Sequence, residues 1–145
     1  MTNDNLIEKL RIVLADTYAL YLKTQSYHWH VTGSNFKSLH ELFEEQYNDL
    51  ADAIDEIAER IIILGSDVPA TFKEYIELTN IQDADNNLDS DRMVTDLTES
   101  QKVLAKSIKE ALEQAQELGD EVSTDLMIGR LAVHEKNEWF LRSSA

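Results

Sequence analysis

Four side chains of the kinds that bind metal ions recur at helical spacing between residues 40 and 59. His40 and Glu44 are four residues apart, and so are Asp55 and Glu59. Residues four apart share a face of an α-helix, so each pair can present its ligand atoms in one direction. The two pairs are separated by about 22 Å, at the helical rise of about 1.5 Å per residue. One helix therefore carries two half-sites and no complete metal site.

These half-sites are symmetric about a point between residues 49 and 50. If the helix packs antiparallel on a second copy of itself and crosses it there, His40 faces Glu59 of the partner subunit. Glu44 then faces Asp55 of the partner subunit. A two-fold dimer would convert the half-sites into two complete sites shared between subunits.

A further histidine, His28, joins this cluster. His28 and His40 are symmetric about Ser34, beside Gly33, so an antiparallel helix hairpin places them at the same level. Mixed imidazole and carboxylate ligands suit iron, zinc or manganese, and the lack of cysteine disfavours a closed structural zinc site. The alternative is that a surface helix rich in Asp and Glu shows such spacings by chance, and the spacing alone leaves both interpretations open.

Length and composition indicate the number of domains and the cellular compartment. We expect residues 1–145 to form a single domain, which is long enough for a substantial core. The polar, acidic start at residues 1–5 predicts no signal peptide, and no apolar run approaches the roughly 20 residues that span a bilayer. Together with the absence of cysteine, this favours a protein of the cytoplasm with no membrane contact.

Hydrophobic periodicity predicts an all-α fold. Amphipathic helices are expected at about residues 5–31, 35–64, 90–118 and 121–142, and three of them end near Gly33, Gly65 and Gly119. About 25 residues separate the second and third helices, which suits a crossover along a bundle. A capping-box pattern at Thr71–Glu74 predicts a short helix within it. The expected fold is a ferritin-like four-helix bundle with one long crossover.

Two patterns favour a site between subunits. The ligand candidates share their helix face with Ala51, Ala58 and Ile62, about 140° from the core stripe of that helix. Scattered alanines on a solvated face would be the simpler explanation. However, the Glu-x-x-His motif that builds a di-iron site within one bundle does not occur in this sequence.

Three segments resemble the Dps family of mini-ferritins. They are residues 28–43 (HWHVTGSNFKSLHELF), residues 54–69 (IDEIAERIIILGSDVP) and residues 134–143 (HEKNEWFLRS). This resemblance implies that His28 and His40 bind iron from one subunit, and that Asp55 and Glu59 complete the site from its two-fold mate. Glu44 falls where the family often has an acidic residue that either binds a second iron or supports the iron ligands. Trp29 falls at the position of an aromatic beside the iron, a candidate electron donor or radical trap.

The same resemblance implies an activity and an assembly. Members of the family form hollow dodecamers, oxidise Fe(II), preferably with hydrogen peroxide, and store the ferric mineral. The expected function is therefore that of an iron-oxidising, iron-storing ferroxidase that protects against oxidative damage. Two alternatives are a nucleoid protein that compacts DNA, with iron binding secondary, and a structural assembly with vestigial ligands.

The formal net charge of −15 bears on how Fe(II) would enter the protein and on whether the protein binds DNA. Acidic channels would concentrate Fe(II), and Asp120 and Asp125 fall where the family lines its three-fold pores. Both residues also suit the capping of a helix N-terminus.

Neither end of the sequence has a cluster of Lys and Arg, and only Lys102, Lys106 and Lys109 align on one helix face. We therefore expect DNA binding to be weak or absent.

The two remaining histidines have other expected roles. His134 continues an apolar stripe, which favours a packed core or interface histidine over a metal ligand. His30 points about 200° away from His28 around its helix, so it is a neighbour of the site or a purely structural residue.

Overall fold

The computed structural model describes residues 2–145; Met1, the first residue of the polar N-terminal segment, lies outside them. Five helices follow one another along the chain: α1 (Asp4–His30), α2 (Phe36–Ile63), α3 (Phe72–Leu78), α4 (Ser90–Leu118) and α5 (Glu121–Arg142). No strand occurs within residues 2–145. The predicted all-α class is confirmed, and the four long helices begin and end within one residue of the expected positions.

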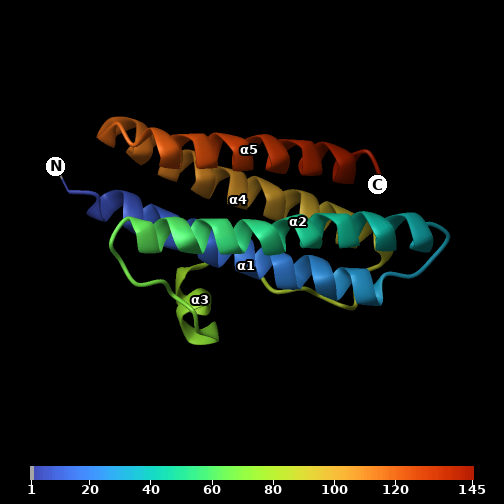
Figure 1. Ribbon diagram of the computed structural model, residues 1–145. Helices are drawn as coiled ribbons and strands as arrows, with labels where there is room; N and C mark the ends of the chain where they lie inside the picture. Colours follow the sequence, from blue (N-terminus) through green and yellow to red (C-terminus); the bar gives the residue numbers. More distant parts are fainter. Residues whose placement is uncertain (1) are drawn as a thin grey trace.

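The long helices form two antiparallel hairpins that lie side by side (Figure 1). One hairpin consists of α1 and α2 and the other of α4 and α5, and α1 also packs on α4. The crossover from α2 to α4 runs back along the bundle and makes these two helices parallel. It contains α3, which contacts α1. This is the expected ferritin-like bundle with one long crossover.

Local sequence signals account for the helix ends. Gly33, Gly65 and Gly119 all have positive φ angles, and Gly119 ends α4 in the left-handed conformation at φ 70°. An L side chain is disfavoured there, whereas glycine is not. At the start of α3, the Thr71 side chain accepts a hydrogen bond from the Glu74 main-chain N–H, and the Thr71 hydroxyl donates to the Glu74 carboxylate. The short helix predicted in the crossover is thereby confirmed.

The core lies where the four long helices meet. The apolar residues Phe43, Leu50 and Ile57, which are spaced seven apart on α2, are fully buried. On α1, the heptad that begins at Ile7 and includes Tyr21 is only partly buried, because these two residues are half-buried while Leu6, Leu10 and Leu20 are fully buried. This heptad follows the edge of the buried face, because α1 packs on three neighbours and buries a wider arc than a coiled-coil seam.

Polar side chains inside the bundle are paired across the helices. The buried Asp16 carboxylate accepts hydrogen bonds from the Thr79 hydroxyl, the Asn80 main-chain N–H and the Ser107 hydroxyl. It therefore joins the crossover segment just after α3 to α1 and α4. Within residues 2–145, none of the helices combines the length and the apolar character needed to cross a lipid bilayer.

Candidate metal centre

His28 and His40 lie face to face at the turn between α1 and α2. Their ring centroids are 3.7 Å apart, and the ring planes differ by 13°. His28 is in the last turn of α1 and His40 is in the second turn of α2, so the hairpin around Gly33 brings them to the same level. The predicted proximity of the two histidines is therefore present in a single subunit.

The two imidazoles are held by reciprocal hydrogen bonds. Nδ1 of His28 lies 2.7 Å from the main-chain oxygen of His40, and Nδ1 of His40 lies 2.7 Å from the main-chain oxygen of His28. A carbonyl oxygen can only accept, so both Nδ1 atoms must carry hydrogen. In the tautomer with hydrogen on Nδ1, the Nε2 atom of each ring has the free lone pair. This is the tautomer that binds a metal ion through Nε2, fixed by a main-chain partner on the other nitrogen.

Glu44 adds a carboxylate on the same side. Its Oε1 atom lies 3.8 Å from Nε2 of His28, while its side chain is 53% exposed. His28 itself is buried, so the carboxylate lies at the solvent side of the imidazole. One subunit therefore places two imidazoles and one carboxylate around the hairpin, with Nε2 of His28 directed toward Glu44.

Two aromatic rings that the sequence reasoning missed frame these histidines. Phe36 stacks on His40 with ring centroids 5.0 Å apart, and Tyr47 meets His28 edge-on at 5.2 Å. Burial, followed by the negative charge of Glu44, raises the pKa of the Tyr47 phenol. Helical spacing could have predicted both neighbours, because Phe36 precedes His40 by four residues and Tyr47 follows Glu44 by three.

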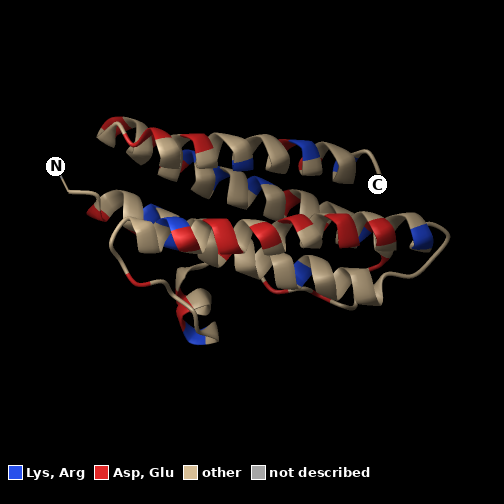
Figure 2. Cartoon of the chain, viewed as in Figure 1, with Lys and Arg blue, Asp and Glu red and all other residues tan. Residues whose placement is uncertain are grey.

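Asp55 and Glu59 lie farther along α2, away from the histidines of their own subunit. Both are exposed, and α2 carries several acidic residues along its length (Figure 2). Ile62, on the predicted interface face, is 56% exposed, and Ala51 is exposed as well. Among residues 2–145, no three His, Asp or Glu side chains gather closely enough to hold a metal ion. The acidic pair Asp55 and Glu59 is thus separated from the histidine pair along α2, as the spacing predicts.

Trp29 lies on another side of α1 from the histidine pair. Its indole is 60% exposed and lines a hollow with Ser26, His30 and Asn86 of the crossover. The exposed His30 ring is hydrogen-bonded to Ser26 one turn earlier, which is a local structural role. Within the described subunit, Trp29 is therefore directed toward the crossover.

Asp120 and Asp125 differ in their surroundings. Asp120 is the N-cap of α5 and accepts from the Ser123 main-chain N–H at 3.0 Å. Both of its carboxylate oxygens also accept from Nη2 of Arg60, at 2.9 and 3.1 Å. Burial opposes ionisation of Asp120, but the hydrogen bonds from Ser123 and Arg60 outweigh it and lower its pKa. Asp125 is exposed and lines a shallow groove that also includes Glu59.

His134 belongs to a polar network in the core. It is 1% exposed, and its Nε2 accepts from Arg130 at 2.9 Å while its Nδ1 lies 2.7 Å from the Gln101 oxygen. Arg130 in turn binds both carboxylate oxygens of Asp49. Burial, together with the Arg130 charge, lowers the His134 pKa to about 3. The prediction of a packed histidine is confirmed, whereas its network, which joins α2, α4 and α5, was missed because it depends on long-range contacts.

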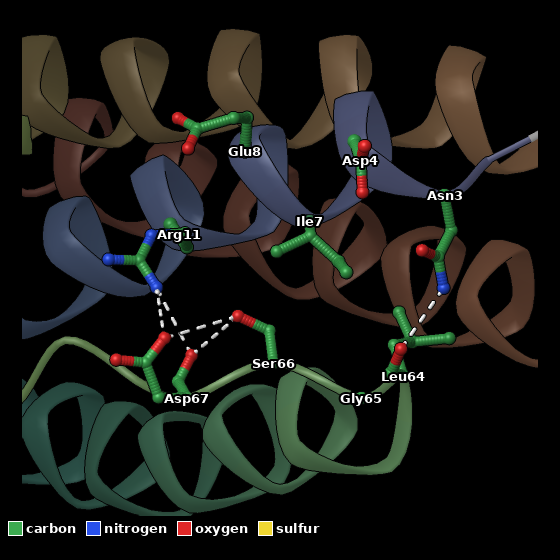
Figure 3. Close-up of a pocket in the computed structure, with 9 residues that line it drawn as sticks. All are labelled: Asn3, Asp4, Ile7, Glu8, Arg11, Leu64, Gly65, Ser66 and Asp67. Atoms are coloured by element: carbon green, nitrogen blue, oxygen red, sulfur yellow. Dashed lines mark hydrogen bonds and ion pairs between the residues drawn. The ribbon is translucent and has the colours of Figure 1, made fainter.

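Another hollow lies away from the histidine pair. It measures about 560 Å³ and lies where the start of α1 meets the end of α2 (Figure 3). Arg11 pairs there with Asp67, and the Asn3 side chain donates to the Leu64 carbonyl. These contacts tie the two helix ends together. None of the predicted metal ligands lines this hollow.

Comparison with known proteins places this geometry in a family. A ferritin-like domain matches residues 7–144. The chain is 39% identical to DNA protection during starvation protein 2 of Bacillus anthracis and 35% identical to general stress protein 20U of Bacillus subtilis, with 97% of both chains covered in each case.

Solved structures give the same result. Dps from Staphylococcus aureus superposes with a TM-score of 0.95 at 32% identity, over 99% of this chain and 96% of that chain. A Dps protein from Vibrio cholerae, described as a member of the ferritin-like diiron-carboxylate proteins, superposes with a TM-score of 0.93 at 33% identity, over 97% and 89%. Fold and sequence similarity over nearly the full length therefore agree, and the chain belongs to the Dps family of ferritin-like proteins.

Proposed function

We propose that this protein is a ferroxidase that oxidises Fe(II), with hydrogen peroxide as the preferred oxidant, and stores the ferric product. The observation that carries the proposal is the reciprocal hydrogen bonding of His28 and His40, which leaves both Nε2 atoms as lone-pair donors. Two fixed imidazoles beside a carboxylate form a half-site suited to a borderline cation such as Fe(II). Fe(II) is the substrate, and membership of a family that includes diiron-carboxylate proteins supports it over zinc or manganese.

The other half of each site comes from a second subunit in this proposal. Asp55 and Glu59 lie on an exposed face of α2, far from their own histidines, and the symmetry about residues 49 and 50 brings them to those of a two-fold partner. Glu44 then lies between the histidines and the partner carboxylates as a further ligand. Dimers of this kind are the building units of the proposed hollow dodecamer.

The reaction at such a site consumes two reactants that are harmful together. Two Fe(II) ions give one electron each, and peroxide with two protons leaves as two water molecules. The carboxylates from the partner balance the charge that grows as Fe(II) becomes Fe(III). Because both electrons go to the same peroxide molecule, no hydroxyl radical is released, and this is how the reaction protects the cell.

The acidic start of α5 is the proposed route by which Fe(II) enters. Asp125 is free to attract cations, because it is exposed and makes no ion pair among residues 2–145. Asp120 is already neutralised by Arg60, so its contribution to an attractive potential is smaller. Electrostatic focusing at such an opening would raise the local concentration of Fe(II).

Mixed assemblies test the shared site directly. Subunits with His28→Ala and His40→Ala should be inactive alone, and so should subunits with Asp55→Ala and Glu59→Ala. Co-assembly of the two kinds should restore peroxide-driven Fe(II) oxidation, because some two-fold interfaces then join an intact histidine half to an intact carboxylate half. Glu56→Gln, an exposed carboxylate beside Asp55 on another side of the helix, is the matched control and should stay active.

Two results would reject the proposal. One is a mixed assembly, verified by mass, that is no more active than its parents. The other is unchanged Fe(II) oxidation in either parent variant.

A further inference from the structure

Four of the five tyrosines in this chain form a continuous line of aromatic rings that starts at the histidine pair. Tyr47 meets His28 edge-on at 5.2 Å between ring centroids. Tyr21 follows at 5.9 Å from Tyr47, and Tyr18 at 5.9 Å from Tyr21. Tyr75 then stacks on Tyr18 at 4.8 Å with an interplanar angle of 20°. The line therefore runs from α2 across α1 to α3 in the crossover.

The surroundings of these tyrosines distinguish them from the core. The buried core consists mainly of aliphatic side chains, whereas all four tyrosines in the line are half-buried. The fifth tyrosine, Tyr27, is buried instead, and its phenol donates to Asp96 and accepts from the Asp85 main-chain N–H. Tyr27 is thus a structural residue of the bundle, while the others share mainly ring contacts.

Edge-on and stacked rings at these separations stabilise a fold by modest amounts. Packing of this kind needs aromatic rings but no phenol group, and phenylalanine would serve equally well. Tyrosine differs from phenylalanine because it can give up one electron and one proton to become a neutral phenoxyl radical. Electron transfer through protein falls off steeply with distance, so adjacent rings exchange electrons far faster than separated ones.

We infer that this line of tyrosines passes electrons toward the metal centre. A radical formed beside the centre thereby moves through Tyr47, Tyr21 and Tyr18 to Tyr75 on α3. This inference rests on the proposed ferroxidase function and concerns the case in which a centre holds a single Fe(II) ion. Peroxide then takes one electron from Fe(II) and needs a second one. Without a second donor, the one-electron product is a hydroxyl radical.

Tyr47 supplies that second electron through the His28 ring, and it gives up its phenol proton at the same time. With one further proton from solvent, peroxide leaves as two water molecules, and the products are Fe(III) and a neutral Tyr47 radical. Tyr21 then donates an electron and a proton to Tyr47, Tyr18 donates to Tyr21, and Tyr75 donates to Tyr18. The radical ends on Tyr75, which lines a hollow on the surface with Thr71 and Phe72.

Spin trapping with peptide mapping tests this path on the assembled protein. The protein is loaded without oxygen with less Fe(II) than fills its centres, and is then mixed with hydrogen peroxide and a nitroso spin trap. In the unmodified protein we expect trap adducts on Tyr75 and a tyrosyl signal in freeze-quenched EPR spectra. Tyr47→Phe should lose the adduct on Tyr75, although the two residues lie at opposite ends of the line.

Further variants separate conduction from folding. Tyr21→Phe breaks the line one ring farther from His28 and should also lose the adduct on Tyr75. Tyr75→Phe should move the adduct to Tyr18. Tyr27→Phe, the fifth tyrosine, should keep the Tyr75 adduct and serves as the matched control. Thermal unfolding of each assembled variant shows that the rings still pack.

The outcomes discriminate between this inference and the proposed function. If the unmodified protein oxidises Fe(II) but Tyr75 is labelled equally in the Tyr47→Phe and Tyr21→Phe proteins, conduction along the line is rejected and the ferroxidase remains. Labelling of Trp29 alone, unaffected by these substitutions, would also reject it. If the unmodified protein does not oxidise Fe(II) with peroxide at all, both are rejected.

Discussion

The Nδ1 atom of His28 and that of His40 each lie 2.7 Å from the main-chain oxygen of the other histidine. This pair of hydrogen bonds has two consequences. It fixes the tautomer with a free Nε2 on both rings, and it cross-links the last turn of α1 to the second turn of α2. The same contact therefore stabilises the hairpin and, in the proposed function, prepares both rings to bind a metal ion.

These two roles can be separated at His40. In His40→Asn, the amide nitrogen can still donate to the His28 carbonyl, but no atom replaces Nε2. We expect His40→Asn and His40→Ala both to lower the rate of Fe(II) oxidation by at least about tenfold. His40→Ala should lose about 1 kcal/mol more unfolding free energy than His40→Asn, because only alanine leaves the carbonyl without its donor. Urea unfolding at equal protein concentrations and stopped-flow oxidation measure the two effects. Equal stability of the variants would show that the hydrogen bond does not support the hairpin.

Asp120 is expected to matter for stability. Asp120→Ala removes the N-cap of α5 and leaves the half-buried Arg60 without its carboxylate, so the unfolding free energy should fall by about 1–2 kcal/mol. Asp125→Ala, an exposed residue of the same helix, is the control and should have a much smaller effect. Chemical denaturation of both variants makes the comparison, and similar losses would argue against the capping role.

Asp125 is expected to matter for iron uptake. Asp125→Asn removes an exposed charge near the start of α5 without changing the shape of the side chain. Initial Fe(II) uptake should slow at low ionic strength, and the difference from the unmodified protein should shrink as salt screens the charge. Asp120→Asn should have the smaller effect on uptake, because Arg60 already neutralises that carboxylate. If neither substitution changes the rate of Fe(II) uptake, the start of α5 is excluded as the entry route.

His134 makes the stability of the fold dependent on pH. Its pKa is lowered to about 3 by burial and by Arg130, whereas the unfolded chain has a histidine pKa near 6.5. Above the unfolded pKa, both states are neutral at this residue and the stability is unaffected. As the pH falls from about 6.5 toward 3, the unfolded state binds a proton that the folded state cannot, so stability is lost by up to about 1.4 kcal/mol per pH unit.

The variant His134→Gln isolates this contribution. It keeps a polar side chain between Arg130 and Gln101 but cannot titrate. Unfolding free energies measured between pH 7 and pH 5 should fall less steeply for His134→Gln than for the unmodified protein. Parallel slopes would mean that other groups cause the acid sensitivity.

DNA binding is expected to be weak in spite of the names of the relatives. The net charge of −15 repels phosphates, and the exposed Lys102 is already paired with Glu99. At physiological salt and in the presence of EDTA, the assembled protein should not retard duplex DNA in a gel. Millimolar Mg²⁺ should allow only a weak association that a chelator reverses. Micromolar or tighter binding with EDTA present would instead favour the nucleoid-protein alternative.

The sequence by itself determined the helices, their order and the level of the two histidines. Apolar periodicity and the three glycines set the ends of the long helices, because these signals act within a few residues along the chain. The short helix after Thr71 followed from its capping pattern for the same reason. The long connection then required a crossover, and the hairpin around Gly33 required His28 and His40 to be neighbours.

Only the tertiary structure decided how the side chains are used. The free Nε2 atoms depend on carbonyl groups from the opposite helix, and the neutralisation of Asp120 depends on Arg60, sixty residues away in the chain. The line from Tyr47 to Tyr75 joins three helices. These relationships depend on the rotation of each helix about its axis and on contacts between distant residues. Packing of the whole bundle sets both, and no local spacing in the sequence encodes them.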